Sequence, residues 1–119
     1  MHRVLVVDDD LVLQESVRNA LEYHNFQVDV ADNGAKAVSA VYREKDDLVV
    51  MDVNMPEMDG IELARRATEL DPDLKVMFIT GFAAVALNAD SKAPKDAKVL
   101  SKPFHLRDLV DEVNKLHAA

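Results

Sequence analysis

Several aspartates in this sequence of 119 residues directly follow short apolar runs. Asp8, Asp9 and Asp10 come after one such run, and Asp52 comes after another. Unbroken, β-branched runs are typical of parallel strands that are buried on both faces of a sheet. Because open parallel sheets bind ligands outside the carboxyl ends of their strands, the sequence predicts an acidic site at that edge.

Clustered carboxylates repel one another, and two unit charges about 4 Å apart do so by about 4 kcal/mol at the dielectric of a protein surface. The carboxylates must therefore raise their pKa values or bind a cation. A site with only oxygen ligands suits Mg²⁺, which takes one or two carboxylates and keeps several waters. We expect the ion to contact Asp9 directly and Asp8 through water.

A magnesium ion beside a carboxylate also suits phosphoryl transfer, because positive charge offsets the charge of the incoming group. Asp52 is the predicted nucleophile. Two further side chains come to the same edge, since Thr80 and Lys102 each follow a later apolar run. The Thr80 hydroxyl can reach a phosphoryl oxygen, and Lys102 is the predicted fixed positive charge.

Each of these residues also has a purely structural interpretation. An aspartate at a strand end is often a helix cap or a turn former, and Asp10 fits that role best. Lys102 could be a solvated surface lysine, and Thr80 a strand residue with a satisfied hydroxyl. Taken together, these interpretations require all the residues to meet at one edge by accident.

Five apolar segments alternate with helical patterns, which predicts one α/β domain with a parallel sheet and helices on both faces. The alternating segment 26–30 suits an edge strand that is wetted on one side. Asp10 and Asn33 are predicted helix caps, and Asp71–Pro72 a helix end. The expected strands are 4–7, 26–30, 48–51, 76–79 and 99–100. The helical patterns are Leu13, Val17, Ala20, Leu21 and His24; Val38, Val41 and Tyr42; Ile61, Ala64, Ala67 and Leu70; and Leu106, Leu109, Val110, Val113 and Leu116. A fifth helix is expected at 82–89, where nearly all residues are apolar and the helical spacing is less clear.

The composition argues against several classes of protein. The chain has 14 Lys and Arg against 22 Asp and Glu, a formal net charge of −8, and no cysteine. Without cysteine there are no disulfides, zinc–thiolate sites or thiol nucleophiles. The negative charge argues against direct binding of nucleic acid. No apolar run approaches the ~18 residues of a membrane span and no signal peptide is visible, so we expect a cytoplasmic protein that does not bind membranes.

The residues singled out above resemble the receiver domain of two-component response regulators along the whole chain. The matching motifs are VVDDD at 6–10, MDVNMPEMDG at 51–60, ITG at 79–81 and SKPF at 101–104. The resemblance implies a flavodoxin-like (βα)5 doubly wound parallel sheet with strand order 2-1-3-4-5. It also implies a single receiver domain over residues 1–119, with no output domain.

The same resemblance assigns roles to the site. Asp52 would accept a phosphoryl group from a histidine kinase or a histidine phosphotransfer protein, and the chain would lose it slowly without being an enzyme in its own right. Mg²⁺ would be held by Asp9, Asp52 and the backbone carbonyl of Asn54. Many receivers place Tyr or Phe three residues before the lysine, where this chain has Val99. The familiar coupling of the Thr80 hydroxyl to an aromatic side chain therefore lacks its usual partner here.

From residue 55 onward the sequence is similar to CpdR-type single-domain regulators, which act as phosphorylation-controlled adaptors for the ClpXP protease. This similarity implies a ClpX-type unfoldase, or its substrates, as partners. We expect residues 82–89 to form the surface that responds to phosphorylation, with burial against the sheet as the alternative.

Other functions also fit: a small aspartyl-phosphate phosphohydrolase, a phosphotransfer intermediate without an adaptor role, and a pseudo-receiver that only binds partners. Asn54 argues against the phosphohydrolase, because such enzymes usually have an acid/base aspartate at that position.

Overall fold

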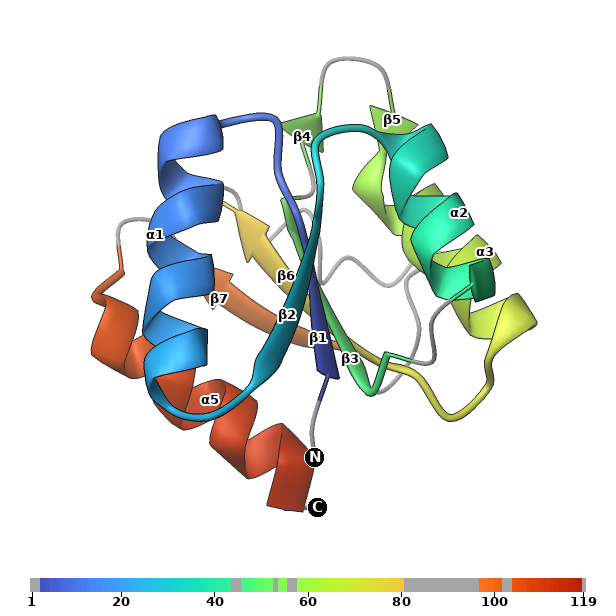
Figure 1. Ribbon diagram of the computed structural model, residues 1–119. Coiled ribbons are helices and arrows are strands. Elements are labelled where there is room, and N and C mark those ends of the chain that lie inside the picture. The colour runs from blue at the N-terminus through green and yellow to red at the C-terminus, as the bar shows by residue number, and fades with distance from the viewer. Residues whose placement is uncertain are drawn as a thin grey trace.

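The computed structural model describes residues 3–43, 46–52, 54–55, 58–80, 97–101 and 104–118. At its centre, five parallel strands form one sheet in the order β2-β1-β3-β6-β7 (Figure 1). A short antiparallel pair, β4 with β5, stands apart from this sheet. The strands are β1 (Arg3–Val7), β2 (Gln27–Ala31), β3 (Leu48–Asp52), β4 (Asn54–Met55), β5 (Met58–Asp59), β6 (Lys75–Thr80) and β7 (Lys98–Ser101). With the long strands counted along the chain, the predicted order 2-1-3-4-5 is confirmed.

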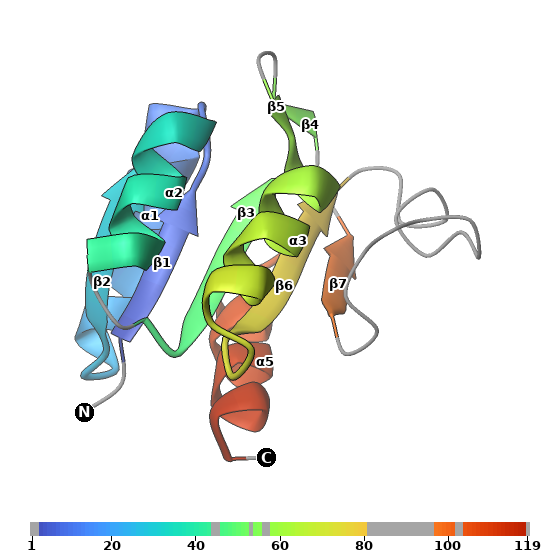
Figure 2. The same ribbon diagram turned by 90° about the vertical axis from the view of Figure 1, so that its right-hand side faces the viewer.

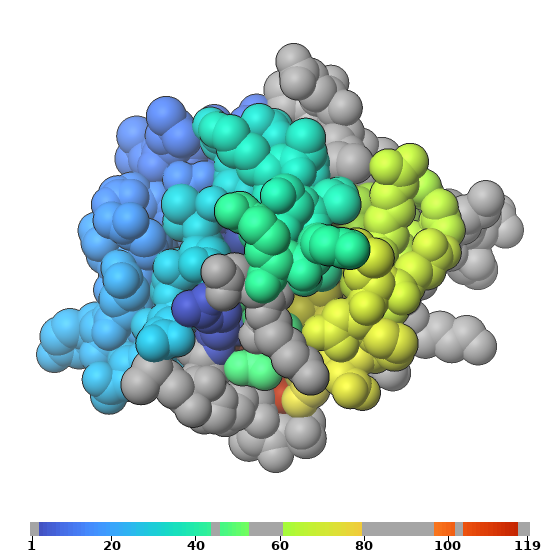
Figure 3. All heavy atoms as spheres, turned by 45° about the vertical axis from the view of Figure 1, so that its right-hand side comes forward, coloured from blue at the N-terminus to red at the C-terminus, as the bar shows by residue number. Residues whose placement is uncertain are grey.

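Helices cover both faces of this sheet (Figure 2). They are α1 (Leu11–Tyr23), α2 (Gly34–Arg43), α3 (Gly60–Leu70) and α5 (Leu106–Ala118). Helices α1 and α5 lie on one face, and α2 and α3 lie side by side on the other, where Figure 3 shows them as spheres. The helical pattern expected at 82–89 lies outside the described residues. None of the described helices is long and apolar enough to span a membrane.

The core consists of two apolar layers, one on each face of the sheet. Along β1, for example, Leu5 and Val7 pack toward α2 and α3, whereas Val4 and Val6 pack toward α1 and α5. Every residue of β3 is buried for the same reason. Burial on both faces explains why the central strands are unbroken apolar runs. Strand β2 lies at the sheet edge and is only partly buried, as its alternating sequence predicts.

The predicted caps hold two of the helices. Oδ1 of Asp10 accepts hydrogen bonds from the N–H groups of Val12 and Leu13, at 3.0 and 3.2 Å. Oδ1 of Asn33 accepts one from the N–H of Lys36 at 2.8 Å. All three bonds satisfy donors in the first helical turn, which have no partner within the helix.

Some residues of the helical patterns do not lie in the core. His24 is the exposed C-cap of α1, and Tyr42 is 78% exposed near the end of α2. Leu70 and Leu106 lie at helix ends and are also exposed. Helical spacing predicts which residues share one side of a helix, but it does not predict how deeply each of them is buried.

Candidate functional site

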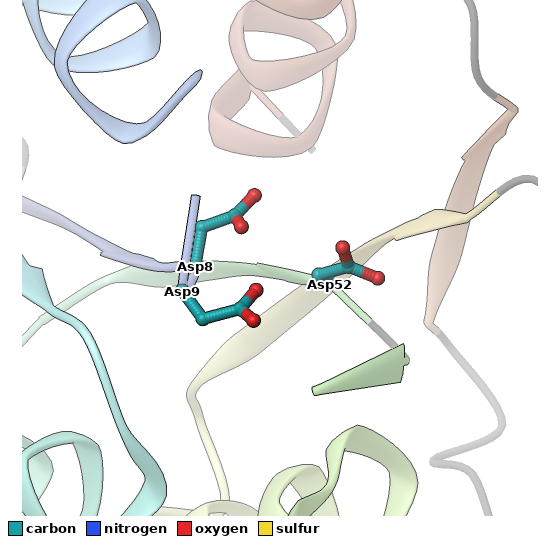
Figure 4. A group of neighbouring side chains, drawn as sticks. All are labelled: Asp8, Asp9 and Asp52. Atoms are coloured by element: carbon teal, nitrogen blue, oxygen red, sulfur yellow. The ribbon is translucent and has the colours of Figure 1, made fainter. Parts of the chain in front are cut away.

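Three carboxylates from two neighbouring strands meet at the carboxyl edge of the sheet. Asp8 and Asp9 directly follow β1, and Asp52 is the last residue of β3. The two strands are paired in parallel, with Val7 opposite Met51. The next residue of each strand, Asp8 and Asp52, therefore reaches the same level of the sheet. One carboxylate oxygen from each aspartate lies within 4.8 Å of the other two. In Figure 4, the carboxylates of Asp8 and Asp9 both point toward the side of Asp52.

The carboxylates of this cluster differ in burial. Asp8 and Asp52 are only 2% and 8% exposed, whereas Asp9 is exposed. The cluster therefore opens to solvent on the side of Asp9. Burial of like charges in contact is unfavourable unless a cation or protons offset them. An all-oxygen donor set with an open side suits a hard divalent cation that keeps part of its water, such as Mg²⁺.

The backbone fixes Asp8 within this cluster. Its Oδ1 accepts a hydrogen bond of 2.9 Å from the N–H of Asp10. Its own N–H donates to the carbonyl oxygen of Ala31, the last residue of β2, at 3.1 Å. Both the main chain and the side chain of Asp8 are thus held by neighbouring backbone groups.

Strands β6 and β7 bring further residues to the same edge. In the β3–β6 pair, Ile79 lies opposite Asp52, so Thr80 is the next residue of β6 along this edge. In the β6–β7 pair, Ser101 lies opposite Thr80. Asn54 belongs to the short strand β4, just after Asp52 in the chain. The described residues do not include Lys102, nor the side chains of Thr80 and Asn54.

Val99 occupies a position on β7 where many receivers have an aromatic residue. It lies opposite Phe78 and is half-buried against the core layer beneath α2 and α3. Its side chain therefore packs as an ordinary sheet residue.

Sequence reasoning missed one residue beside the cluster, Gln14. It is 6% exposed, and its side-chain amide bonds to the carbonyl groups of Asp8 and Ala31. A polar residue within a helical pattern indicates a solvent-facing position, and nothing in the spacing predicts a partner on another strand. One feature of the sequence could have revealed this position. Gln14 lies one helical turn after the cap at Asp10, near the start of the helix that follows the acidic residues.

Comparison with known proteins agrees with this arrangement. The family model of the response regulator receiver domain matches residues 4–114. The response regulator receiver protein CpdR of Brucella abortus is 60% identical over 116 residues, which cover 98% of this chain and 97% of that protein.

Solved structures show the same fold. A response regulator receiver protein from Sinorhizobium medicae superposes with a TM-score of 0.89 at 30% identity, covering 99% of this chain and 95% of the other. The response regulator TrrA of Thermotoga maritima, solved in complex with Mg²⁺ and BeF, gives a TM-score of 0.85 at 30% identity and covers 98% and 99%. An acidic cluster at the carboxyl edge of a 2-1-3-4-5 sheet, in a chain that matches these proteins over nearly its whole length, makes this protein a CpdR-like member of the response regulator receiver domain family.

Proposed function

We propose that this receiver domain is a phosphorylation switch in which Asp52 accepts a phosphoryl group from a histidine kinase or a histidine phosphotransfer protein. The observation that supports this role is the convergence of Asp8, Asp9 and Asp52 at one edge of the sheet. Asp52 is the member of the cluster that ends a central strand, and every residue of that strand is buried.

The residues of this chain have separate tasks in the transfer. An oxygen of Asp52 attacks phosphorus, the P–N bond of the phosphohistidine breaks, and the imidazole nitrogen leaves with the electron pair and takes a proton from solvent. The product on this chain is an aspartyl phosphate. The Thr80 hydroxyl donates a hydrogen bond to a phosphoryl oxygen, and the Lys102 ammonium opposes the added negative charge.

The acidic cluster supports a role for Mg²⁺ in this step. Asp9, Asp52 and the backbone carbonyl of Asn54 would hold the ion directly, and Asp8 would do so through water. When bound, Mg²⁺ supplies positive charge that reduces the repulsion between the carboxylates and the incoming phosphoryl oxygens.

The proposed output is a change in protein binding. A phosphoryl group adds about −1.5 to −2 charges and three acceptor oxygens. We assign the responding surface to residues 82–89, because this apolar segment follows Thr80 in the chain. The CpdR-type resemblance makes a ClpX-type unfoldase, or a substrate of its protease, the candidate partner in the cytoplasm.

Incubation with acetyl phosphate and Mg²⁺ tests the switch directly. Intact mass spectrometry should show one added phosphoryl group on the wild type and on Asp10→Asn, a matched control in the same acidic run, but none on Asp52→Asn. When EDTA is present from the start of the incubation, no adduct should form. If the wild type forms no adduct, the chain is a pseudo-receiver. Sustained release of phosphate from phosphomonoesters would instead identify a phosphohydrolase.

The adaptor role requires a separate experiment. Wild type with and without acetyl phosphate, and Asp52→Ala, are immobilised and exposed to a purified ClpX-type unfoldase. The adaptor role predicts that retention of the unfoldase depends on the phosphorylation state. Absence of retention in every state would contradict that role and leave the chain as a phosphotransfer intermediate.

A further inference from the structure

Gln14 is a buried polar residue in the second turn of α1, next to the acidic cluster. Its Nε2 lies 3.2 Å from the carbonyl oxygen of Asp8 and 3.1 Å from the carbonyl oxygen of Ala31. A primary amide nitrogen carries two hydrogens, so this one group donates to both acceptors. Because both partners are acceptors, the amide must present its nitrogen to them, and the side chain has one orientation.

The two acceptors are at the ends of neighbouring strands. Asp8 directly follows β1, and Ala31 is the last residue of β2. The N–H of Asp8 also donates to the carbonyl oxygen of Ala31. Asp8 is therefore held through its N–H by Ala31 and through its carbonyl by Gln14. With both peptide groups fixed, its side chain leaves the backbone on the side of Asp52 (Figure 4).

The helix that carries Gln14 is itself well anchored. On the same helix, Val17 and Leu21 are 1% and 0% exposed in the layer beneath α1 and α5. Oδ1 of Asp10 caps the first turn. The amide of Gln14 is thus presented from a fixed element, which is the condition for a supporting residue to orient another side chain.

We propose that Gln14 is a positioning residue for the cation site: it holds the backbone of Asp8 so that the carboxylate stays directed at Asp9 and Asp52. This inference rests on the proposed function, because it assumes that the cluster binds Mg²⁺. The alternative is that Gln14 only satisfies two buried carbonyl groups and contributes to stability alone.

The test compares Gln14→Met with two controls. Methionine has nearly the length of glutamine but no N–H donors. Gln27→Met makes the same change at an exposed position on β2, and Val17→Ala destabilises α1 from the core without touching the acidic cluster. Isothermal titration with MgCl₂, well below the unfolding temperature of every variant, gives the Kd for Mg²⁺.

We expect Gln14→Met to weaken Mg²⁺ binding about tenfold, the lower end of the effect of outer residues that support metal ligands. Gln27→Met and Val17→Ala should bind Mg²⁺ as the wild type does. In the acetyl phosphate reaction, raising the Mg²⁺ concentration should restore the rate of Gln14→Met, because its defect lies in binding the ion.

The outcomes separate this inference from the proposed function. If Gln14→Met loses stability as Val17→Ala does but keeps the wild-type Kd, Gln14 is only structural, and the phosphorylation switch still stands. If the wild type itself binds no Mg²⁺, the proposed function fails and the positioning role fails with it.

Discussion

The backbone N–H of Asp10 donates a hydrogen bond of 2.9 Å to Oδ1 of Asp8. The carboxylate of Asp10 is used elsewhere, since its Oδ1 accepts from the N–H groups of Val12 and Leu13 in the first turn of α1. The three consecutive aspartates therefore have different tasks. Asp8 and Asp9 belong to the acidic cluster, whereas Asp10 caps the helix and supports Asp8 through its main chain only.

Replacement of Asp10 separates these tasks. Asp10→Ala should lower the free energy of unfolding by about 1 kcal/mol, because the cap of α1 is lost. The Mg²⁺ affinity should stay near that of the wild type, because the backbone N–H to Asp8 remains. Urea denaturation and titration with MgCl₂ measure the two effects. Asp10→Ser should keep most of the stability, because serine also caps helices. If Asp10→Ala weakened Mg²⁺ binding as much as Asp9→Ala does, Asp10 would be part of the cation site and not only a helix cap.

Asp9→Asn should raise the stability of the metal-free protein and reduce the stability that Mg²⁺ adds. In EDTA the variant should unfold at a higher temperature than the wild type, because Asp9 no longer repels Asp8 and Asp52. At a Mg²⁺ concentration ten times the wild-type Kd, the wild type should gain about 1.4 kcal/mol, and a variant that binds about tenfold more weakly about 0.4 kcal/mol. Thermal unfolding in the two buffers measures both. A variant that is less stable in EDTA would show that the cluster is not strained by repulsion.

Local patterns predicted the parts of this structure that depend on local rules. The apolar runs of β1 and β3 marked strands buried on both faces, and the acidic residues after them predicted that carboxylates meet at one edge of the sheet. The caps at Asp10 and Asn33 were also evident, because a cap bonds only to residues a few positions away.

Features that depend on distant parts of the chain were not predicted. The environment of Gln14 is set by the carbonyl of Ala31, which is 17 positions away and on another element. His24 and Tyr42 follow the helical spacing of core residues, yet both are exposed at or near the ends of their helices. The roles of Thr80 and Lys102 stay predictions, since they depend on side chains outside the described part of the molecule.

Glu62 in α3 predicts a pH dependence of stability. Hydrogen bonds from Arg65, at 3.0 and 2.5 Å, and a weaker one from Arg66 lower the pKa of Glu62 from 4.5 to about 2. The folded state thus favours the carboxylate, so its contribution is present above pH 4.5 and is lost as the pH falls toward 2.

The difference in unfolding free energy between wild type and Glu62→Gln, from urea denaturation, should therefore shrink between pH 4.5 and about 2. Added NaCl should reduce the difference at neutral pH as well, because the pair is exposed to solvent. If the difference in unfolding free energy between the two proteins were the same at pH 4.5 and at about pH 2, the guanidinium groups would not stabilise the Glu62 carboxylate.

Two leucines on α5 provide a matched test of the core. Leu109 is fully buried between α5 and the sheet, whereas Leu106, one turn earlier, is 38% exposed. Leu109→Ala should cost about 2–5 kcal/mol of unfolding free energy, and Leu106→Ala about 1 kcal/mol or less. Urea denaturation of the two variants compares them directly. If the two variants lost the same unfolding free energy, Leu106 would contribute to the core as much as Leu109 does.

The start of α1 is the surface on which we expect the phosphodonor protein to dock. Leu11 and Val12 are 62% and 77% exposed and lie directly after the acidic residues. Val12→Ser should slow transfer from a phosphorylated histidine phosphotransfer protein about tenfold, the effect of losing one well-placed apolar contact at an interface. With acetyl phosphate the rate should not change, because a small donor makes no such contact.

Tyr23→Ser is the control, since Tyr23 is similarly exposed at the far end of the same helix. Equal slowing by both variants, or slowing with acetyl phosphate, would show that Val12 acts through the helix and not through the interface.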